Sequence, residues 1–190
     1  MNHFFAYLAR MKNIKRWGLM RNTAEENIQE HSMQVAVLAH GLALIRNRYF
    51  GGDVDPNRVL AIAVYHDVSE VITGDLATPI KYFNPEIQRA YKAIESVAEE
   101  KVIAMLPPEL QAEYRPFIRP ERDEAYAIVK AADRLAAYIK CVEELRMGNQ
   151  EFQKAKEAIG RDIAALGRPE VDFFLNHFMD SFTLTLDELN

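Results

Sequence analysis

The chain has 190 residues, of which 49% are hydrophobic and 27% charged, and its formal net charge is −5. This size and composition fit one globular domain covering residues 1–190, and mixed, slightly acidic charge argues against a broad nucleic-acid-binding surface. Cys141 is the only cysteine, which excludes an intrachain disulfide, and no stretch has the roughly 18 apolar residues of a membrane span. We therefore expect a cytoplasmic protein with neither nucleic acid nor membrane as a partner.

Helical periodicity dominates the chain, and no segment alternates like a half-buried strand, so we predict an all-α fold. A short amphipathic helix begins near Phe4 and is followed by an aperiodic polar segment, residues 15–22. This segment carries the single tryptophan next to an arginine. Asn27, with Glu30 three residues later, predicts a capping box for an apolar, central helix over residues 28–45.

Further helix starts are marked by a capping residue followed by proline, and helix ends by glycine. Asp55-Pro56 predicts a helix that continues through residues 66–70 and closes at Gly74. A loop over residues 75–79 follows. The remaining expected helices cover residues 84–105, 109–114, 120–146, 152–166 and a last segment that begins after residue 169.

The segment His66-Asp67-Val68-Ser69-Glu70 suggests a site, because an imidazole and two carboxylates follow an apolar run. In an α-helix that turns about 100° per residue, Asp67 lies about 100° from His66 and Glu70 about 40° from it. The three side chains then share one face, with Glu70 in the middle. Such a set could hold a metal ion and move a proton beside it. The alternative is a helix end that is merely polar.

Other histidines are weaker candidates. His31 lies early in the central helix, where a buried core or capping histidine is the alternative to a ligand. His40 stands nine residues later, about 180° around the helix, so the two cannot serve one site. His3 and His177 lie near the chain ends without carboxylate neighbours at a useful spacing.

Asp133 stands among alanines and leucines where the pattern calls for an apolar residue, and aspartate is rarely buried unless paired. Its charge needs compensation by a cation or by an arginine from another helix. Together His31, His66, Asp67 and Asp133 would make a mixed nitrogen–oxygen set suited to Co²⁺, Zn²⁺, Mn²⁺, Fe²⁺ or Ni²⁺. Four protein ligands leave open positions only on an ion that accepts five or six, which favours Co²⁺ or Mn²⁺.

At these residues the sequence resembles the HD-domain metal-dependent phosphohydrolases, whose hallmark is H…HD…D. It is most similar to the bacterial 5′-deoxynucleotidases within them. Gly18 departs from the proline expected after the tryptophan. The stretches that carry the resemblance are His3–Ala6, Arg16-Trp17, Leu19–Asn22, Glu26-Asn27, Glu30–Ser32, Tyr65–Asp67, Ser69-Glu70, Thr73–Leu76, Thr78-Pro79, Lys81–Asn84, Lys140-Cys141, Glu143–Leu145 and Leu184–Glu188.

The resemblance implies an all-α HD-domain helical bundle, a homodimer, one divalent metal ion per subunit with Co²⁺ favoured, and a deoxyribonucleoside 5′-monophosphate as substrate. By position, His31, His66, Asp67 and Asp133 would bind the metal. Arg16 would hold the phosphate, and Trp17 would pack on the sugar and disfavour a 2′-hydroxyl. Glu70 and Asp75 would serve the chemistry, and Asp75 would also touch substrate.

In this interpretation the metal ion supplies Lewis-acid chemistry for in-line attack of water on phosphorus, and Arg16 offers forked donors to the phosphoryl oxygens. Glu70 and Asp75 divide the proton transfers in an order that the sequence leaves open. The alternatives are another HD-domain activity, such as a phosphodiesterase or triphosphohydrolase, and a non-catalytic nucleotide-binding HD module. Intact Arg16, Glu70 and Asp75 argue against the non-catalytic module.

Overall fold

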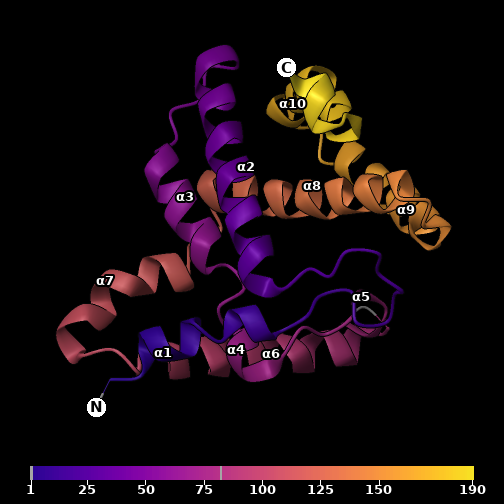
Figure 1. Cartoon of the computed structure of the whole chain (residues 1–190). Coiled ribbons are helices and arrows are strands. Elements are labelled where there is room, and N and C mark those ends of the chain that lie inside the picture. The colour runs from indigo at the N-terminus through magenta and orange to yellow at the C-terminus, as the bar shows by residue number, and fades with distance from the viewer. Residues whose placement is uncertain (1, 82) are drawn as a thin grey trace.

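The computed structural model describes residues 2–81 and 83–190 (Figure 1). Met1 and Tyr82, the second of which belongs to one of the stretches of resemblance, lie outside the described residues. The described part consists of helices and their connections, and its extended pairing is one isolated bridge between Lys15 and Asn27. The all-α prediction is confirmed.

The helices differ widely in length, and in the described ranges none combines the length and apolar character that a membrane span requires. Short 3₁₀ helices are η1 Met11–Asn13, η2 Gln150–Phe152, η3 Met179–Thr183 and η4 Leu186–Leu189. The α-helices are α1 Phe4–Leu8, α2 Ile28–Tyr49, α3 Pro56–Tyr65, α4 Glu70–Thr73, α5 Thr78–Lys81, α6 Pro85–Ile103, α7 Pro108–Ile118, α8 Glu124–Arg146, α9 Gln153–Ala164 and α10 Pro169–Phe178.

The predicted starts of α2, α3 and α6 are confirmed by the side chains that cap them. The Asn27 carboxamide oxygen accepts the Glu30 backbone N–H at 3.0 Å, and the Glu30 carboxylate accepts the Asn27 N–H at 3.4 Å, which completes a capping box. The Asp55 and Asn84 side chains cap α3 and α6 by accepting the backbone N–H groups of Asn57 at 2.9 Å and Ile87 at 2.8 Å. The start of α8 is four residues later than predicted, because the Asp123 side chain accepts the Tyr126 N–H at 3.0 Å and caps the helix there.

Further boundaries differ from the prediction, and α2 extends to Tyr49 instead of residue 45. The expected loop over residues 75–79 runs into the short helix α5, and α7 extends to Ile118 instead of residue 114. None of these differences falls on a residue of the expected site. The nearest is the start of α5 at Thr78, three residues after Asp75.

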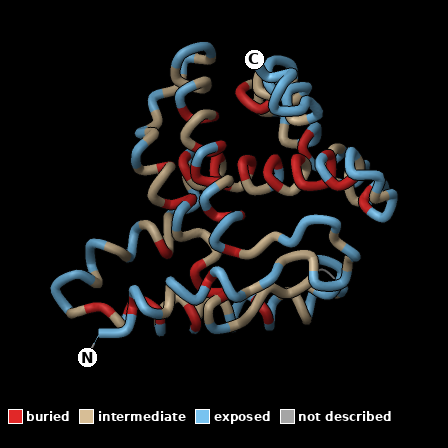
Figure 2. The backbone as a smooth tube through the Cα atoms, viewed as in Figure 1, coloured by how far each residue is buried: buried red, intermediate tan, exposed pale blue. Residues whose placement is uncertain are grey.

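The main core lies where α2 packs on α3 and α8 (Figure 1). Buried residues recur along α8, which crosses behind α2 (Figure 2). The three helices contribute, among others, Leu42, Ile62 and Leu135, all 1% exposed or less. At roughly 25 cal/mol per Å² of buried apolar surface, such a core stabilises the three-helix arrangement strongly. It fixes α2 and α8, the helices that carry His31 and Asp133.

A second, smaller hydrophobic cluster lies below the first, around α1, α6 and the ends of α7 (Figure 2). Phe4, Val102 and Ile118 belong to it, and so does Val68 from the segment after α3. Val68 is only 1% exposed. The segment with His66 and Asp67 therefore runs between the two clusters and is held by both.

The predicted continuous helix from Pro56 to Gly74 is wrong, because α3 ends at Tyr65 and α4 begins at Glu70. A continuous helix would bond the Asp67 N–H to the Ala63 carbonyl, but this oxygen lies 2.7 Å from His66 Nδ1. The linking residues form tight turns instead, with the Glu70 N–H bonded to the Asp67 carbonyl at 3.0 Å.

These turns change which side chains share a face. At about three residues per turn, residues three apart eclipse each other, so Glu70 lies over Asp67 and not between Asp67 and His66. The expected convergence survives in an altered form, because Glu70 lies near Asp67 while Asp67 Oδ2 also lies 3.2 Å from His66 Nε2.

Candidate functional site

Three separate helical segments bring the predicted ligands together. His31 lies in the first turn of α2, His66 and Asp67 follow α3, and Asp133 lies in the middle of α8. One ligand atom each from His31, His66 and Asp133 lies within 4.8 Å of the others. The structure thus assembles residues that are up to 102 positions apart in the sequence.

The individual distances describe a compact cluster. His31 Nε2 lies 3.0 Å from Asp133 Oδ1, and His66 Nε2 lies 3.9 Å from the same oxygen. Asp67 Oδ2 lies 3.2 Å from His66 Nε2 and 3.7 Å from His31 Nε2. Two imidazoles and two carboxylates from three segments of the chain therefore face one another.

The donor set fits a divalent metal ion. His66 Nδ1 lies against the Ala63 carbonyl, which can only accept, so Nδ1 carries the proton and Nε2 presents its lone pair to the cluster. Among the described residues, the buried Nε2 atom has no hydrogen-bond partner. A buried nitrogen lone pair beside two carboxylates is the arrangement that a borderline divalent cation satisfies.

The charges of the cluster are strongly coupled. Burial opposes the charge on His31, but hydrogen bonds to Asp133 and Glu26 outweigh it and raise the His31 pKa to about 9. Burial also opposes ionisation of the two aspartates. Even so, the pKa of Asp67 is held below its ordinary range by His66, and the pKa of Asp133 is held below its ordinary range by Lys130. The site is therefore a concentrated negative charge that a cation, or a proton on His31, neutralises.

Arg16 and Trp17 lie on the loop before α2, at the rim of the cluster. Arg16 Nη1 is 3.4 Å from Asp67 Oδ2, and Arg16 Nε donates to Glu26 Oε2 at 3.2 Å. Trp17 Nε1 donates to the same Glu26 oxygen at 2.8 Å. Trp17 has a φ of 57°, a left-handed conformation that is unusual for a large side chain and is maintained only by surrounding contacts.

Glu26 is a residue of this site that the sequence analysis missed. Its carboxylate receives Arg16 and Trp17, and its other oxygen lies 3.6 Å from His31 Nδ1. It thus joins the rim to the cluster. The available signal was an acidic residue just before the Asn27 cap, which is no stronger than many others in the chain.

Lys130 was also missed. It lies one turn before Asp133 on α8, with its Nζ 3.3 Å from Asp133 Oδ2. The ammonium group thereby holds the carboxylate oxygen that points away from His31, and so orients the Asp133 side chain.

Glu70 and Asp75 lie near enough to Asp67 for its charge to act on both. Glu70 is buried, and within the described residues its Oε2 has no hydrogen-bond partner. Burial, reinforced by the charges of Asp67 and Asp75, raises the Glu70 pKa to about 9. Burial likewise raises the Asp75 pKa, although Arg16 opposes the rise. Two carboxyl groups with a raised pKa beside an arginine can hold and transfer a proton.

The cluster does not include His3, His40 or His177. His177 lies on α10, where its ring Nδ1 faces the Phe173 carbonyl at 2.8 Å. The interpretation of these three histidines as residues outside the site agrees with the geometry.

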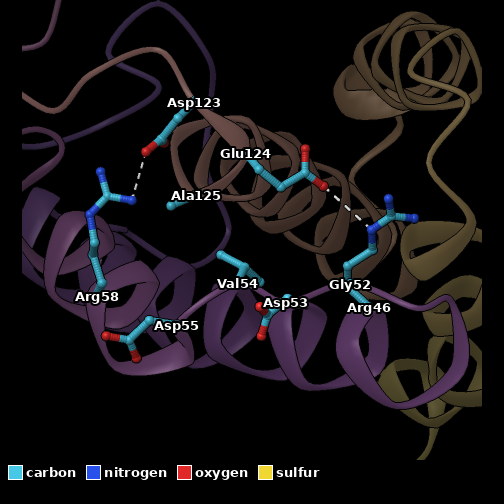
Figure 3. A pocket seen from close by; sticks show the side chains of 9 residues that line it. All are labelled: Arg46, Gly52, Asp53, Val54, Asp55, Arg58, Asp123, Glu124 and Ala125. Atoms are coloured by element: carbon cyan, nitrogen blue, oxygen red, sulfur yellow. Dashed lines mark ion pairs between the residues drawn. The ribbon is translucent and has the colours of Figure 1, made fainter.

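A separate hollow lies at the other end of α2, where Arg46, Asp53, Arg58 and Glu124 are among its lining residues (Figure 3). Its two arginines are already paired, Arg58 with Asp123 at 2.7 Å and Arg46 with Glu124 at 3.4 Å, as the dashed lines mark (Figure 3). Both arginines of the hollow are therefore already neutralised, and its other charged lining residues include the carboxylates of Asp53 and Asp55, which do not suit a phosphate ligand.

The chain is similar to curated proteins over its full length. A family model described as 5′-deoxynucleotidase YfbR-like matches residues 3–182. A 5′-deoxynucleotidase of Vibrio vulnificus is 53% identical over 191 residues, which covers 100% of this chain and 98% of that protein. The 5′-deoxynucleotidase yfbR of Photorhabdus temperata is 52% identical over 192 residues, with the same coverage.

Solved structures show the same fold at lower identity. An HD-domain phosphohydrolase from Listeria innocua gives a TM-score of 0.82 at 22% identity, covering 95% of this chain and 88% of that chain. The cyanophage S-2L HD phosphohydrolase DatZ, bound to dA and one catalytic Zn²⁺ ion, gives a TM-score of 0.64 at 21% identity, covering 93% and 96%. The predicted HD-domain architecture is confirmed.

Proposed function

The chain belongs to the YfbR-like family of 5′-deoxynucleotidases, and from this premise we propose that its His–Asp cluster acts on deoxyribonucleoside 5′-monophosphates with one divalent metal ion. The protein is a phosphoric monoester hydrolase, which forms deoxynucleoside and phosphate from the nucleotide and water. The observation that best supports the site is the convergence of ligand atoms from His31, His66 and Asp133 within 4.8 Å.

We propose that His31, His66, Asp67 and Asp133 hold the metal ion, one per subunit. When bound, such an ion supplies Lewis-acid polarisation of a phosphate oxygen and lowers the pKa of a water molecule. The mixed donor set suits Co²⁺, which we favour, and also Mn²⁺, Zn²⁺, Fe²⁺ or Ni²⁺. The Zn²⁺ ion and the dA bound to the cyanophage enzyme support the pairing of a metal with a deoxynucleoside here.

Arg16 is proposed to bind the phosphate. Its guanidinium is permanently charged and forked, so two N–H groups can bond two phosphoryl oxygens at once, which lysine cannot do. Glu26 holds the Nε edge at 3.2 Å, and this contact fixes the plane of the guanidinium. The contact of Nη1 with Asp67 at 3.4 Å keeps the other edge beside the cluster.

Trp17 is proposed to pack on the sugar and to disfavour a 2′-hydroxyl. Its indole N–H is occupied by Glu26, and its ring lies against Phe152 with the ring centroids 5.3 Å apart. A ring held on two sides presents a fixed apolar wall. A hydroxyl facing this wall would lose its hydrogen bonds to water without replacement, which costs free energy.

Glu70 and Asp75 are proposed to handle the proton. The pKa of Glu70 is raised to about 9, so this group retains a proton near neutral pH and is suited to protonate the leaving 5′-oxygen. Burial also raises the pKa of Asp75, but the charge of Arg16 opposes this rise. Asp75 is therefore suited to accept the proton of the attacking water. This assignment gives each carboxyl group one half of the transfer.

We propose that two molecules of the chain form a homodimer. Met33, Val37 and Leu44 are 64%, 57% and 49% exposed and lie four and seven residues apart on α2, which places them on one helix face. If the homodimer covers this face, the Val37→Glu variant should be monomeric where the wild-type protein is dimeric. Sedimentation equilibrium measures this difference. A monomeric wild-type protein would contradict the proposal.

We also propose that residues 1–190 form a single HD domain and that the enzyme works in the cytoplasm. A single cysteine that is free and buried suits a reducing compartment.

The activity is tested on protein stripped of metal with a chelator. The stripped protein is incubated with dAMP, AMP, dATP and 2′,3′-cAMP, each with and without Co²⁺, Mn²⁺ or Zn²⁺, and phosphate, pyrophosphate and nucleoside are measured. We expect metal-dependent phosphate from dAMP and little from AMP. Pyrophosphate from dATP would indicate a triphosphohydrolase, and no turnover with any metal would contradict every enzymatic interpretation.

A further inference from the structure

The loop that carries Arg16 and Trp17 is closed at its base and exposed along its outer part. The Arg16 N–H bonds the Glu26 carbonyl at 2.9 Å, and the Ile28 N–H bonds the Ile14 carbonyl at 3.0 Å, so both ends of the loop meet. Between them, the residues 21 and 23–25 are exposed. Burial of apolar surface therefore does not hold the outer loop, and its position depends on polar contacts.

Those contacts come from a buried ion pair at the carboxyl end of α8. Glu144 is fully buried, and its two carboxylate oxygens accept the backbone N–H groups of Thr23 at 2.9 Å and Ala24 at 3.1 Å. Lys140, 5% exposed, bonds both Glu144 and the Ala24 carbonyl. Asn149 donates to Glu144 and to the Arg21 carbonyl, both at 2.7 Å.

The same region supports Trp17 from behind. The side-chain amide of Asn22, next to the anchored residues, donates to the Trp17 carbonyl at 3.3 Å. The Trp17 ring rests on Phe152, which is fully buried, and Lys140 Nζ lies 5.7 Å from the centroid of the Phe152 ring. Both the backbone of Trp17 and the surface under its ring are thus linked to Lys140 and Glu144.

Stability alone does not account for a charged pair at this place. A buried ion pair is often no more stabilising than apolar residues of the same volume, because removing two charges from water costs as much as their attraction returns. A carboxylate, however, can accept two adjacent backbone N–H groups and a lysine together, which no apolar side chain can do. The pair is therefore suited to fix the course of an exposed loop.

We propose that Lys140, Glu144 and Asn149 form a positioning anchor that holds the Trp17 loop in place and thereby sets the discrimination between deoxyribonucleotides and ribonucleotides. The inference rests on the proposed function, because it assumes that Trp17 faces the sugar. None of the three residues touches the substrate. Their effect passes through the loop backbone and through Phe152.

The test compares Glu144→Gln with a matched control, Glu170→Gln. Glu170 is also fully buried and paired, with Arg168 at 2.5 Å, but it lies at the start of α10 and has no hydrogen bond to the loop among the described residues. Asn149→Ala is a milder variant in case Glu144→Gln does not fold. For each protein we would measure the melting temperature and the ratio of kcat/KM for dAMP to that for AMP.

Tryptophan fluorescence gives a second, independent measurement. Trp17 is the only tryptophan, so its emission wavelength and its quenching by acrylamide report on this loop alone. The anchor predicts that Glu144→Gln shifts the emission to longer wavelength and increases quenching well below the melting temperature. It also predicts that the dAMP-to-AMP ratio falls about tenfold, since small misplacements of a positioning group are costly in rate.

Asn149→Ala is expected to change emission and ratio in the same direction by less, and Glu170→Gln to lower the melting temperature while leaving both at wild-type values. Wild-type emission and ratio in Glu144→Gln and Asn149→Ala would overturn the anchor, as would an equal fall of the ratio in Glu170→Gln. A wild-type enzyme without preference for dAMP would contradict the proposed role of Trp17, and fluorescence would then still test whether the anchor holds the loop.

Discussion

Replacement of Glu26 by glutamine is the sharpest test of the site, because one carboxylate joins the phosphate-binding, sugar-binding and metal-binding parts. Glu26 is largely buried, with 11% of its side chain exposed. Burial opposes its ionisation, but His31 and Arg16 outweigh burial and lower its pKa, so the group is charged at neutral pH. Glutamine keeps the shape of the side chain and removes the charge.

The magnitude follows from the two hydrogen bonds at 3.2 Å from Arg16 and 2.8 Å from Trp17. A hydrogen bond to a charged group contributes about 1.5–3 kcal/mol and a neutral one about 0.5–1.5 kcal/mol, so the Trp17 contact weakens by about 1 kcal/mol. The Arg16 contact keeps a charged donor but loses its ion pair, which costs a further ~1 kcal/mol. The sum of about 2 kcal/mol corresponds to a roughly 30-fold loss of kcat/KM for dAMP. Metal binding should persist, because all four proposed ligands remain.

The assay is steady-state hydrolysis of dAMP at saturating Co²⁺, combined with a Co²⁺ titration of the stripped protein. Glu25→Gln is the matched control, since Glu25 is the neighbouring residue, is 71% exposed and, within the described residues, has the exposed Lys15 as its only ion-pair partner. It should leave kcat/KM unchanged. A Glu26→Gln enzyme within twofold of wild type would refute the argument that Glu26 holds Arg16 and Trp17 in their working positions.

Further predictions concern the proton, pH and the turn after α3. Glu70→Gln should lower kcat about 100-fold or more at unchanged Co²⁺ affinity, because a proton-transfer group contributes about 10²–10⁴ in rate, and near-normal turnover would remove Glu70 from the mechanism. Burial opposes ionisation of Glu144, but Lys140 and backbone N–H groups lower its pKa to about 2, below the ordinary value of 4.5. The ionised Glu144 therefore stabilises the fold above pH 4.5, and this stabilisation is lost as the pH falls toward 2. In urea unfolding, the difference in unfolding free energy between wild type and Glu144→Gln should shrink from pH 7 to pH 3. A constant difference would count against the ion pair. Val68→Ala should lower the free energy of unfolding in urea by about 2 kcal/mol and weaken Co²⁺ binding. The control Val64→Ala, at a residue 38% exposed, should change neither quantity, and equal effects of the two substitutions would contradict the role given to Val68.

Local chemistry explains which parts of the fold the sequence could predict. Asn27, Asp55 and Asn84 cap helices through contacts with residues two or three positions away, so the starts of α2, α3 and α6 can be read directly. The ligand types were also readable, since a carboxylate such as Asp133 in an apolar helix needs a partner. That it meets His31 required the packing of α2 on α8.

The break after Tyr65 could not be predicted from periodicity, because its causes are tertiary and side-chain specific. Val68 is drawn into the second cluster, and His66 Nδ1 occupies the Ala63 carbonyl that a continuous helix would use. Glu26 and Glu144 were missed for a related reason. Glu26 lies in an aperiodic loop and Glu144 near the end of a helix. Glu144 bonds Thr23, which lies 121 positions away, and sequence spacing does not reveal such a contact.

The placement of the ligand-bearing turn between two hydrophobic clusters has a consequence for cooperativity. His31 and Asp133 belong to helices of the main core, while Val68, next to Asp67, belongs to the smaller cluster with α6 and the end of α7. An ion bound to the four proposed ligands would couple the local unfolding of the smaller cluster to that of the main core, since the ion binds only when both regions are folded. Amide hydrogen exchange in α6 and α7 should therefore slow when Co²⁺ is added, although neither helix supplies a ligand.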